Sequence, residues 1–345
     1  MRRIALALVL LAAALCGCRR DTAPHACSPF GDPPAKFVAN VVPACKRGVR
    51  LGPWKDSDGT DRYACLYEPA QASASKPLPL VVWLHPSLFP ADIVESQTNL
   101  LDYLQTAKIS GDPNRPGFIL LAPEGRDTTH YYVWPDDKGK GWDNWYRQFS
   151  PKRDVSAGGV AYKENVDAAA IDHFIAAEEA TGKVDTKRVY VSGWSNGGAM
   201  AYAYGLARPQ IAAIGVYSAP DPYRFVLDPC PQTPVAIAPT SNAELQVFNP
   251  RIASYQIHNS CDIMGLCPNA LRLESQLRAL GGSVSDVIID ANQKQVTACD
   301  SSCGTDANGD LHNFGASTRG VAHHLRWPSE WTPALLEFFR QHPTR

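Results

Sequence analysis

Residues 188–201 read RVYVSGWSNGGAMA, and they carry the strongest structural signal in the sequence. It opens with a β-branched and aromatic strand pattern, and a run of small residues that favours a helix begins at Asn196. Between the two lies a G-x-S-x-G sequence centred on Ser195, which is typical of a serine nucleophile held at a tight strand-to-helix turn. Glycine is required at Gly193 and Gly197 because such a turn leaves no room for side chains. We therefore predict that Ser195 is an exposed nucleophile.

Apolar segments alternate with helical patterns on both sides of this turn. We predict strands at 62–67, 80–84, 118–122, 188–192, 212–217, 254–258 and 284–289, and helices at 164–181, 196–207, 269–280 and 333–340. Short, continuous apolar strands that alternate with helices indicate an α/β fold, with a mostly parallel sheet that helices cover on both faces. Functional residues of such sheets lie just beyond the carboxyl ends of the strands.

The composition excludes several classes of protein. The chain has 345 residues, of which 45% are hydrophobic and 19% are charged, close to ordinary globular usage. Disorder, collagen-like repetition and a polytopic membrane protein are therefore disfavoured. The 33 Lys and Arg residues against 34 Asp and Glu residues give a formal net charge of −1, which supplies no electrostatic surface for nucleic acid. We predict no nucleic-acid partner.

The N-terminus has the pattern of an export signal. Residues 1–18 place Arg2 and Arg3 before an apolar run that is too short to span a bilayer. The run ends in LCGC, which resembles a bacterial lipoprotein signal and makes Cys18 the candidate lipidation site; ordinary cleavage nearby, with secretion, is the alternative. We predict an exported protein, either an outer-membrane or periplasmic lipoprotein held only by this lipid anchor or a secreted one. Residues 19–58 are rich in Pro, Gly and Asp and are predicted to be a tether, and 59–345 to form one domain.

Eight cysteines remain once Cys16 and Cys18 are set aside, an even number in an oxidising compartment: Cys27, Cys45, Cys65, Cys230, Cys261, Cys267, Cys299 and Cys303. We predict four disulfides among them. Short spacing favours the pairs Cys299–Cys303 and Cys261–Cys267. Metal binding is disfavoured because the chain has no paired C-x-x-C or Cys/His spacing.

Several segments together resemble one family of enzymes. They are VYVSGWSNGGAMA, KPLPLVVWLH, GTDRYACLYEP, WDNWY and HLRWP, and the likeness runs from about residue 59 to the C-terminus. They resemble the secreted polyhydroxybutyrate depolymerase and feruloyl esterase family. The resemblance implies an α/β-hydrolase fold and ester hydrolysis by a Ser-His-Asp triad, with no cofactor. In this fold the chain order is serine, acid, histidine.

A serine hydroxyl needs a histidine as general base, and the candidates lie downstream of Ser195. His258 is inside a predicted strand, where a buried structural role is expected, and His342 is in the terminal tail. His323 and His324 precede a Trp-Pro pair and the last helix, as the base of the resembled family does. The spacing in that family favours His324, whereas the small residues just before the pair favour His323. We predict His324 and keep His323 as the alternative.

The acid that orients the histidine is predicted to be Asp262. It follows the strand at 254–258, at the place where the resembled family has an aspartate. Four other aspartates are weaker candidates for this acid. Asp286 and Asp290 flank the next strand, and Asp221 and Asp228 fall in a Pro-rich loop.

Two main-chain N–H groups are expected to bind the oxyanion. One is that of Asn196, at the start of the helix after the nucleophile. The second normally comes from a His-Gly sequence after the strand that ends at Leu84, but this chain has His85-Pro86-Ser87. Pro86 has no N–H to donate, so we assign the second group to Ser87. His85 is expected to anchor the loop by a hydrogen bond.

Large aromatic residues crowd the segment after the strand at 118–122: Tyr131, Tyr132, Trp134, Trp142, Trp145 and Tyr146. They either line an acyl or aryl pocket or pack the segment onto the sheet. Our substrate-binding candidates are Trp142 and Trp145, with Trp194 of the nucleophile turn. The segment 306–310 begins like a calcium loop, but Leu311 and Ser317 stand where the turn glycine and the closing glutamate are needed, so no metal is predicted.

These observations predict an exported serine esterase that acts on small-molecule esters with short acyl chains or aromatic acids. Long acyl chains need an extended groove, usually under an amphipathic lid helix, and no such helix is visible between Ser195 and His324. A polyester depolymerase is the alternative among enzymes. A catalytically silent, envelope-anchored binding protein of the same fold is the alternative from another class, and Pro86 is the residue that favours it.

Overall fold

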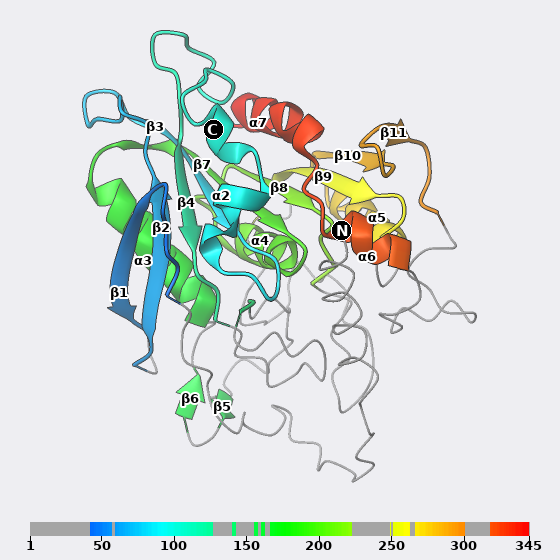
Figure 1. Ribbon diagram of the computed structural model, residues 1–345, viewed down its shortest axis with the longest axis horizontal. Helices are drawn as coiled ribbons and strands as arrows, with labels where there is room; N and C mark the ends of the chain where they lie inside the picture. The colour runs from blue at the N-terminus through cyan, green and yellow to red at the C-terminus, as the bar shows by residue number, and fades with distance from the viewer. Residues whose placement is uncertain are drawn as a thin grey trace, which may run out of the picture.

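The computed structural model describes residues 42–56, 59–126, 140–142, 155–157, 160–162, 166–222, 249, 251–262, 266–300 and 318–344. Within them a nine-stranded sheet crosses the molecule, from β1 at one side to β11 at the other (Figure 1). Its strands are β1 (Val49–Lys55), β2 (Asp61–Tyr67), β3 (Leu78–Leu84), β4 (Ile119–Pro123), β7 (Val184–Trp194), β8 (Ala213–Tyr217), β9 (Ala253–Asn259), β10 (Val284–Ile289) and β11 (Gln295–Val296). A separate hairpin joins β5 (Val155–Ala157) and β6 (Val160–Tyr162).

The order across the sheet is β1-β2-β4-β3-β7-β8-β9-β10-β11. The strands from β4 to β10 are parallel, and β1, β2 and β11 are antiparallel to their neighbours. Parallel neighbours need crossover connections, and helices lie in those from β3 to β4, β4 to β7, β7 to β8 and β9 to β10. The carboxyl ends of β3, β7, β8 and β9 therefore open onto one edge of the sheet.

Helices cover both faces of the sheet. One core contains residues of α3 (Val166–Ala180), α4 (Asn196–Ala207) and α5 (Leu266–Ala279) packed on Leu80, Val82 and Leu84 of β3. The other core packs on Val81 and Trp83 of β3 and contains residues of α7 (Thr332–Gln341) and of the short helices η1 (Ala91–Ile93), α2 (Val94–Gln97) and η2 (Leu100–Tyr103). Every residue of β3 is buried, because alternate side chains enter the two cores. The predicted α/β sheet with helices on both faces is confirmed.

The domain begins earlier in the chain than predicted. β1 falls inside the predicted tether at 19–58, but it pairs with β2 as an antiparallel edge strand. Its side chains are mostly exposed, which is why no apolar pattern marks it in the sequence. The predicted signal at 1–18 and the first part of the predicted tether lie outside the described residues.

The disulfides differ from those predicted. Cys267 is bonded to Cys299, which contradicts both the Cys261–Cys267 and the Cys299–Cys303 predictions. A second disulfide joins Cys45 to Cys65, and Cys261 is disulfide-bonded as well. Short spacing in the sequence misled us because the sheet brings distant segments together. The Cys267–Cys299 bond ties the start of α5 to the segment after β11.

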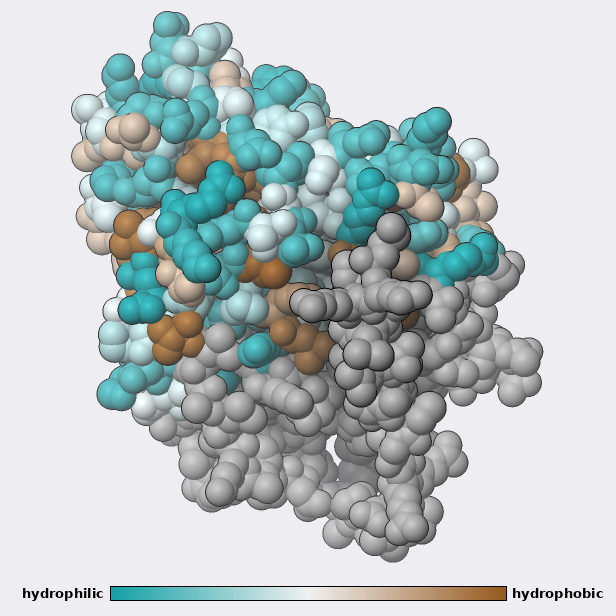
Figure 2. All heavy atoms as spheres, viewed as in Figure 1, coloured by the Kyte–Doolittle hydropathy of each residue, from teal (hydrophilic) through white to brown (hydrophobic). Residues whose placement is uncertain are grey.

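The surface of the described residues is mixed. Figure 2 shows hydrophobic areas that are small and separated by hydrophilic residues on this face. The large hydrophobic side chains that are exposed are Val42, Val49, Leu88 and Leu325. In the described residues, none of the helices is long and apolar enough to cross a bilayer.

Candidate active site

Ser195 lies at a sharp turn between β7 and α4. Its backbone has φ 55° and ψ −122°, which is strained for a residue with a side chain. A Cβ atom added at Gly193 would lie 2.2 Å from the carbonyl oxygen of Gly197, and one added at Gly198 would lie 2.6 Å from Cβ of Ala219. The two close approaches explain why the turn needs glycine. The structure thus forms the tight strand-to-helix turn that the G-x-S-x-G sequence predicts, with Ser195 at its bend.

A chain of hydrogen bonds connects three side chains at this edge of the sheet. Nε2 of His324 lies 2.7 Å from Oγ of Ser195. Nδ1 of His324 lies 2.8 Å from Oδ1 of Asp262. His324 is 6% exposed and Asp262 is 2% exposed, so the ion pair that forms when the ring is protonated is shielded from water. Side chains in this arrangement can act as a nucleophile, a base and an orienting acid.

The structure brings one of the two adjacent histidines to Ser195. His324 is the last residue of α6 (Thr318–His324), and its ring lies between Ser195 and Asp262. Nδ1 of His323 is buried and has no hydrogen-bond partner among the described residues. Neighbouring side chains on a helix point about 100° apart, so only one of the two can face the serine. The alternative base His323 is therefore not the residue placed at the site.

The main chain of His323 and His324 is held by two aromatic residues. The indole Nε1–H of Trp194 donates to the carbonyl of His324 at 3.0 Å, and the hydroxyl of Tyr217 donates to the carbonyl of His323 at 2.9 Å. Trp194 is 2% exposed and packs against Tyr217 and Trp327. We predicted that Trp194 binds substrate, but the structure buries it and gives it this anchoring contact instead.

The other candidate acids and bases have different partners. Asp286 pairs with Arg278 at 2.5 Å, and the carboxylate of Asp290 accepts hydrogen bonds from two main-chain N–H groups of its own turn. His258 is buried and pairs with Glu274 at 2.5 Å, which confirms the expected structural role. Asp221 is buried at the end of the segment after β8, and Asp228 lies outside the described residues.

His85 anchors the loop after β3, as predicted. The main-chain N–H of Gly125 donates to its Nε2 at 2.9 Å, so Nδ1 carries the proton and faces the carbonyl of Pro86 at 2.9 Å. Burial lowers the pKa of His85 to about 4, so the ring is neutral near pH 7. Burial also raises the pKa of the Glu124 carboxyl, which accepts the main-chain N–H of Ala91 at 2.6 Å.

Both predicted oxyanion donors lie at this edge. Asn196 is the first residue of α4, and a Cβ atom added at Gly197 would lie 2.2 Å from the carbonyl oxygen of Leu84, so the start of α4 packs directly on the end of β3. Ser87 is two residues beyond His85 in that same loop. In the part of the chain that the structure describes, its N–H donates no hydrogen bond. The two N–H groups therefore belong to segments in direct contact.

Trp142 is fully buried beside His85, with ring centroids 4.9 Å apart. Its Nε1–H donates to the carbonyl of His85 at 2.9 Å, and its main-chain N–H donates to Oδ1 of Asn196 at 2.7 Å. The predicted substrate contact is therefore not supported for Trp142. The alternative, that this residue packs its segment onto the sheet, agrees with its burial. Trp145 and the four tyrosine and tryptophan residues Tyr131, Tyr132, Trp134 and Tyr146 lie outside the described residues.

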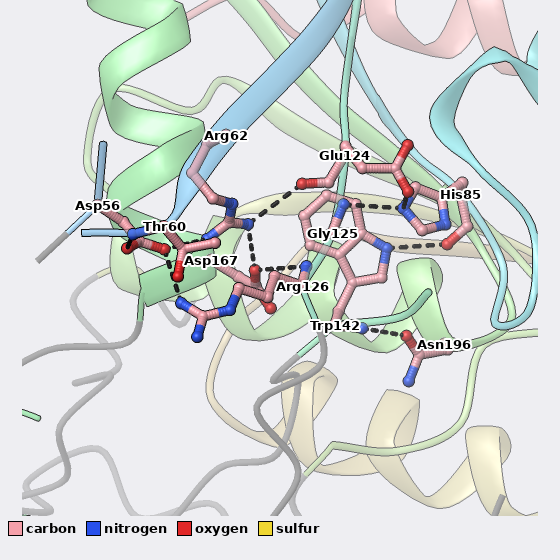
Figure 3. A network of polar contacts seen from close by, with 10 residues as sticks. All are labelled: Asp56, Thr60, Arg62, His85, Glu124, Gly125, Arg126, Trp142, Asp167 and Asn196. Atoms are coloured by element: carbon pink, nitrogen blue, oxygen red, sulfur yellow. Dashed lines mark hydrogen bonds and ion pairs between the residues drawn. The ribbon is translucent and has the colours of Figure 1, made fainter. Parts of the chain in front are cut away.

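A buried cluster of charged residues adjoins this region and was missed by the sequence analysis (Figure 3). Arg62 of β2 contacts Asp167 at 2.5 Å and Asp56 at 3.2 Å, and it also donates to the carbonyl of Glu124 at 3.1 Å. Arg126 pairs with the same Asp56 at 3.0 Å. All four charged side chains are at most 2% exposed. No periodic pattern marks these residues, because each comes from a different segment.

In the same described residues, no group of three or more His, Cys, Asp or Glu side chains is placed to hold a metal ion. The calcium-like segment at 306–310 lies outside them.

Comparisons with known proteins support the fold. Neither a protein-family model nor a curated protein matches the chain. A ferulic acid esterase structure shares 15% identity over 85% of this chain and 98% of its own, with a TM-score of 0.50. A CE1 ferulic acid esterase from Anaeromyces mucronatus shares 16% identity over 78% of this chain and 91% of its own, with a TM-score of 0.49. A thermostable esterase shares 16% identity over 71% of this chain, with a TM-score of 0.43, and this chain spans 55% of its length. Together with the strand order and the elbow, the first of these likenesses shows that the chain has the α/β-hydrolase fold.

Proposed function

We propose that this protein is a serine carboxylic ester hydrolase that uses Ser195, His324 and Asp262 as its triad. The observation that carries the proposal is the unbroken hydrogen-bond chain from Oγ of Ser195 through His324 to Asp262, at 2.7 and 2.8 Å. A surface serine without such partners is a weak nucleophile, whereas this one has a base in contact with its hydroxyl. The strained elbow supports the same role, because backbone strain of this kind clusters at functional sites.

The proposed reaction has two halves. Oγ of Ser195 attacks the ester carbonyl while Nε2 of His324 takes its proton, and the resulting tetrahedral oxyanion is bound by the N–H groups of Asn196 and Ser87. The intermediate collapses to an acyl-enzyme, and the alcohol leaves with the proton that His324 carried. Water then attacks the acyl-enzyme by the same route and releases the acid. Asp262 holds the ring in the tautomer that leaves Nε2 free to accept.

For the substrate, we propose small esters with a short acyl group or an aromatic acid. Leu88 and Leu325 follow Ser87 and His324 directly and are 45% and 43% exposed, so apolar surface is available beside the site. The structural similarity to a protein named ferulic acid esterase makes aryl esters a first choice for assay. The region between β8 and β9 that a lid would occupy lies largely outside the described residues. The alternative, hydrolysis of polyester chains, is tested by adding hydroxyalkanoate oligomers as substrates in the same assays.

We further propose that the protein is exported, with a lipid anchor at Cys18. The two disulfides Cys45–Cys65 and Cys267–Cys299 support an oxidising compartment. The Cys18→Ser variant is expected to leave the membrane fraction, since the proposed anchor is its only membrane contact. Unchanged partition of this variant would contradict the anchor.

The proposal is tested by labelling with a fluorophosphonate probe and by assaying aryl and p-nitrophenyl esters of increasing chain length. The probe is expected to modify Ser195 in the wild-type protein and to leave Ser195→Ala unlabelled. Ester turnover of Ser195→Ala should fall at least 10³-fold at unchanged thermal stability. Labelling elsewhere, or turnover of the variant within tenfold of wild type, would contradict the proposed function. Absence of both labelling and turnover in the wild type would favour the silent binding protein.

A further inference from the structure

Residues Lys140–Trp142 connect the loop after β3 to the start of α4, the two segments that carry the proposed oxyanion donors. Towards the loop after β3, the main-chain N–H of Leu88 donates to the carbonyl of Lys140 at 2.7 Å, and Nε1–H of Trp142 donates to the carbonyl of His85 at 2.9 Å. Towards α4, the main-chain N–H of Trp142 donates to Oδ1 of Asn196 at 2.7 Å. One three-residue segment thus bonds to both sides of the site (Figure 3).

The segment is also held from behind by Gly125. A Cβ atom added there would lie 2.2 Å from the carbonyl oxygen of Gly141 and 2.8 Å from the Trp142 ring. The same glycine donates its N–H to His85 at 2.9 Å. The loop after β4, the loop after β3 and the 140–142 segment therefore pack as one unit, and the buried Arg62 holds that unit through the carbonyl of Glu124.

The loop after β3 needs such support. Pro86 cannot donate a hydrogen bond, and the N–H of Ser87 donates none among the described residues. Leu88 has φ 72°, a conformation that is unfavourable for a bulky residue and persists only where neighbouring contacts impose it. The bond from Leu88 to Lys140 and the bond from Trp142 to His85 flank Ser87 on both sides. They fix the position of its N–H.

We propose that Trp142 is a positioning residue for catalysis: the 140–142 segment sets the distance between the Ser87 and Asn196 N–H groups, and Trp142 supplies both ends of that link. An oxyanion donor is effective only when it is preorganised at 2.7–3.1 Å from the developing charge. The proton on Nε1 of Trp142 fixes the Ser87 side through His85, and its main-chain N–H fixes the Asn196 side. This inference rests on the proposed ester hydrolysis.

The test uses Trp142→Phe, which keeps a large aromatic ring but removes the bond to His85. The kcat for an aryl ester is expected to fall about tenfold or more with KM within twofold, because the oxyanion forms only after substrate has bound. Inhibition by an aryl trifluoromethyl ketone should weaken by a similar factor. Ser195 adds to this ketone and leaves the same oxyanion on the two N–H groups, with the serine proton on His324.

Trp331→Phe is the matched control. Trp331 donates its Nε1–H to the carbonyl of Gln293 at 2.7 Å, which is the same type of bond at a different place in the fold. It should keep kcat and the inhibition constant within twofold. If Trp142→Phe behaves like this control, the positioning role is wrong. The proposed function would still stand in that case, provided that the wild type hydrolyses the ester. If the wild type does not hydrolyse esters, the proposed function fails and this inference falls with it.

A second variant guards against misfolding of Trp142→Phe. Asn196→Ala removes the acceptor of the Trp142 main-chain N–H but keeps the oxyanion N–H and lies at a partly exposed position. Its kcat and its inhibition by the trifluoromethyl ketone should fall in parallel, by about tenfold. Parallel loss supports the link. Loss of kcat with unchanged ketone inhibition would overturn it, because the defect would then lie outside the oxyanion contacts.

Discussion

The hydroxyl of Ser218 donates a hydrogen bond of 2.6 Å to Oδ2 of Asp262, the carboxylate oxygen that does not face His324. Ser218 follows β8 with φ 48°, and its N–H donates to the carbonyl of Ile257 in the neighbouring strand at 3.0 Å. The strained backbone directs the hydroxyl at the acid. Both oxygens of the carboxylate are thus engaged, and its orientation towards His324 is set from two sides.

We expect Ser218→Ala to lower kcat about tenfold, because Asp262 would lose a hydrogen bond to a charged group, worth about 1.5–3 kcal/mol, and its fixed orientation. Steady-state kinetics on an aryl ester measure this. Ser192→Ala is the control, since the buried hydroxyl of Ser192 has no hydrogen-bond partner among the described residues. Equal kinetics of the two variants would show that Ser218 does not act on the acid.

We expect His324→Ala to lose on the order of 10³-fold or more in kcat and His323→Ala to lose less than tenfold. The ring of His324 lies 2.7 Å from Oγ of Ser195, whereas His323 contributes only its main-chain carbonyl, which alanine keeps. The comparison of kcat and of thermal unfolding for the two variants checks this. The reverse ranking would make His323 the base.

We expect Asp167→Asn to lower the free energy of unfolding by about 3 kcal/mol or more, because it leaves the buried guanidinium of Arg62 short of a charge partner. Denaturant unfolding measures the change. The control is Lys55→Met, which breaks the exposed pair between Lys55 of β1 and Asp61 of β2 and should leave stability unchanged. A similar result for the two variants would mean that the buried cluster does not stabilise the fold.

Stability should depend on pH through His85. Its folded pKa of about 4 lies below the unfolded value of 6.5, so its contribution is fully present above pH 6.5 and is lost as the pH falls towards 4. Between pH 7 and pH 5 this loss is about 2 kcal/mol. Glu124, whose pKa is raised, acts in the opposite direction, because its contribution is lost as the pH rises above 4.5.

The measurement compares wild type with His85→Gln, which keeps an acceptor for Gly125 but does not titrate. Urea unfolding of both at pH 7 and pH 5 should show that the variant loses about 2 kcal/mol less than wild type on acidification, since Glu124 is common to both. Parallel pH dependence in the two proteins would show that His85 is not the titrating group.

Features that depend on neighbouring residues could be predicted from the sequence. The strand pattern at 188–192 and the G-x-S-x-G turn predict the elbow because the turn and its glycines are local, and the alternation of apolar strands with helices predicts the covered sheet. Asp262 could be chosen because it follows a recognisable strand, and parallel strands present their ends at one edge.

Contacts between distant residues became known only from the folded chain. The spacing in the resembled family favours His324 but leaves His323 as the alternative, and the end of α6 places His324 at Ser195. The bond from Ser218 to Asp262 and the link through Trp142 join segments 44 and 54 or more residues apart, and neither has a sequence pattern. Short spacing did not predict the Cys267–Cys299 disulfide, because its two cysteines are 32 residues apart in the sequence. A periodic pattern records which face of an element is buried, but the partner on that face is set by how the sheet folds the chain back on itself.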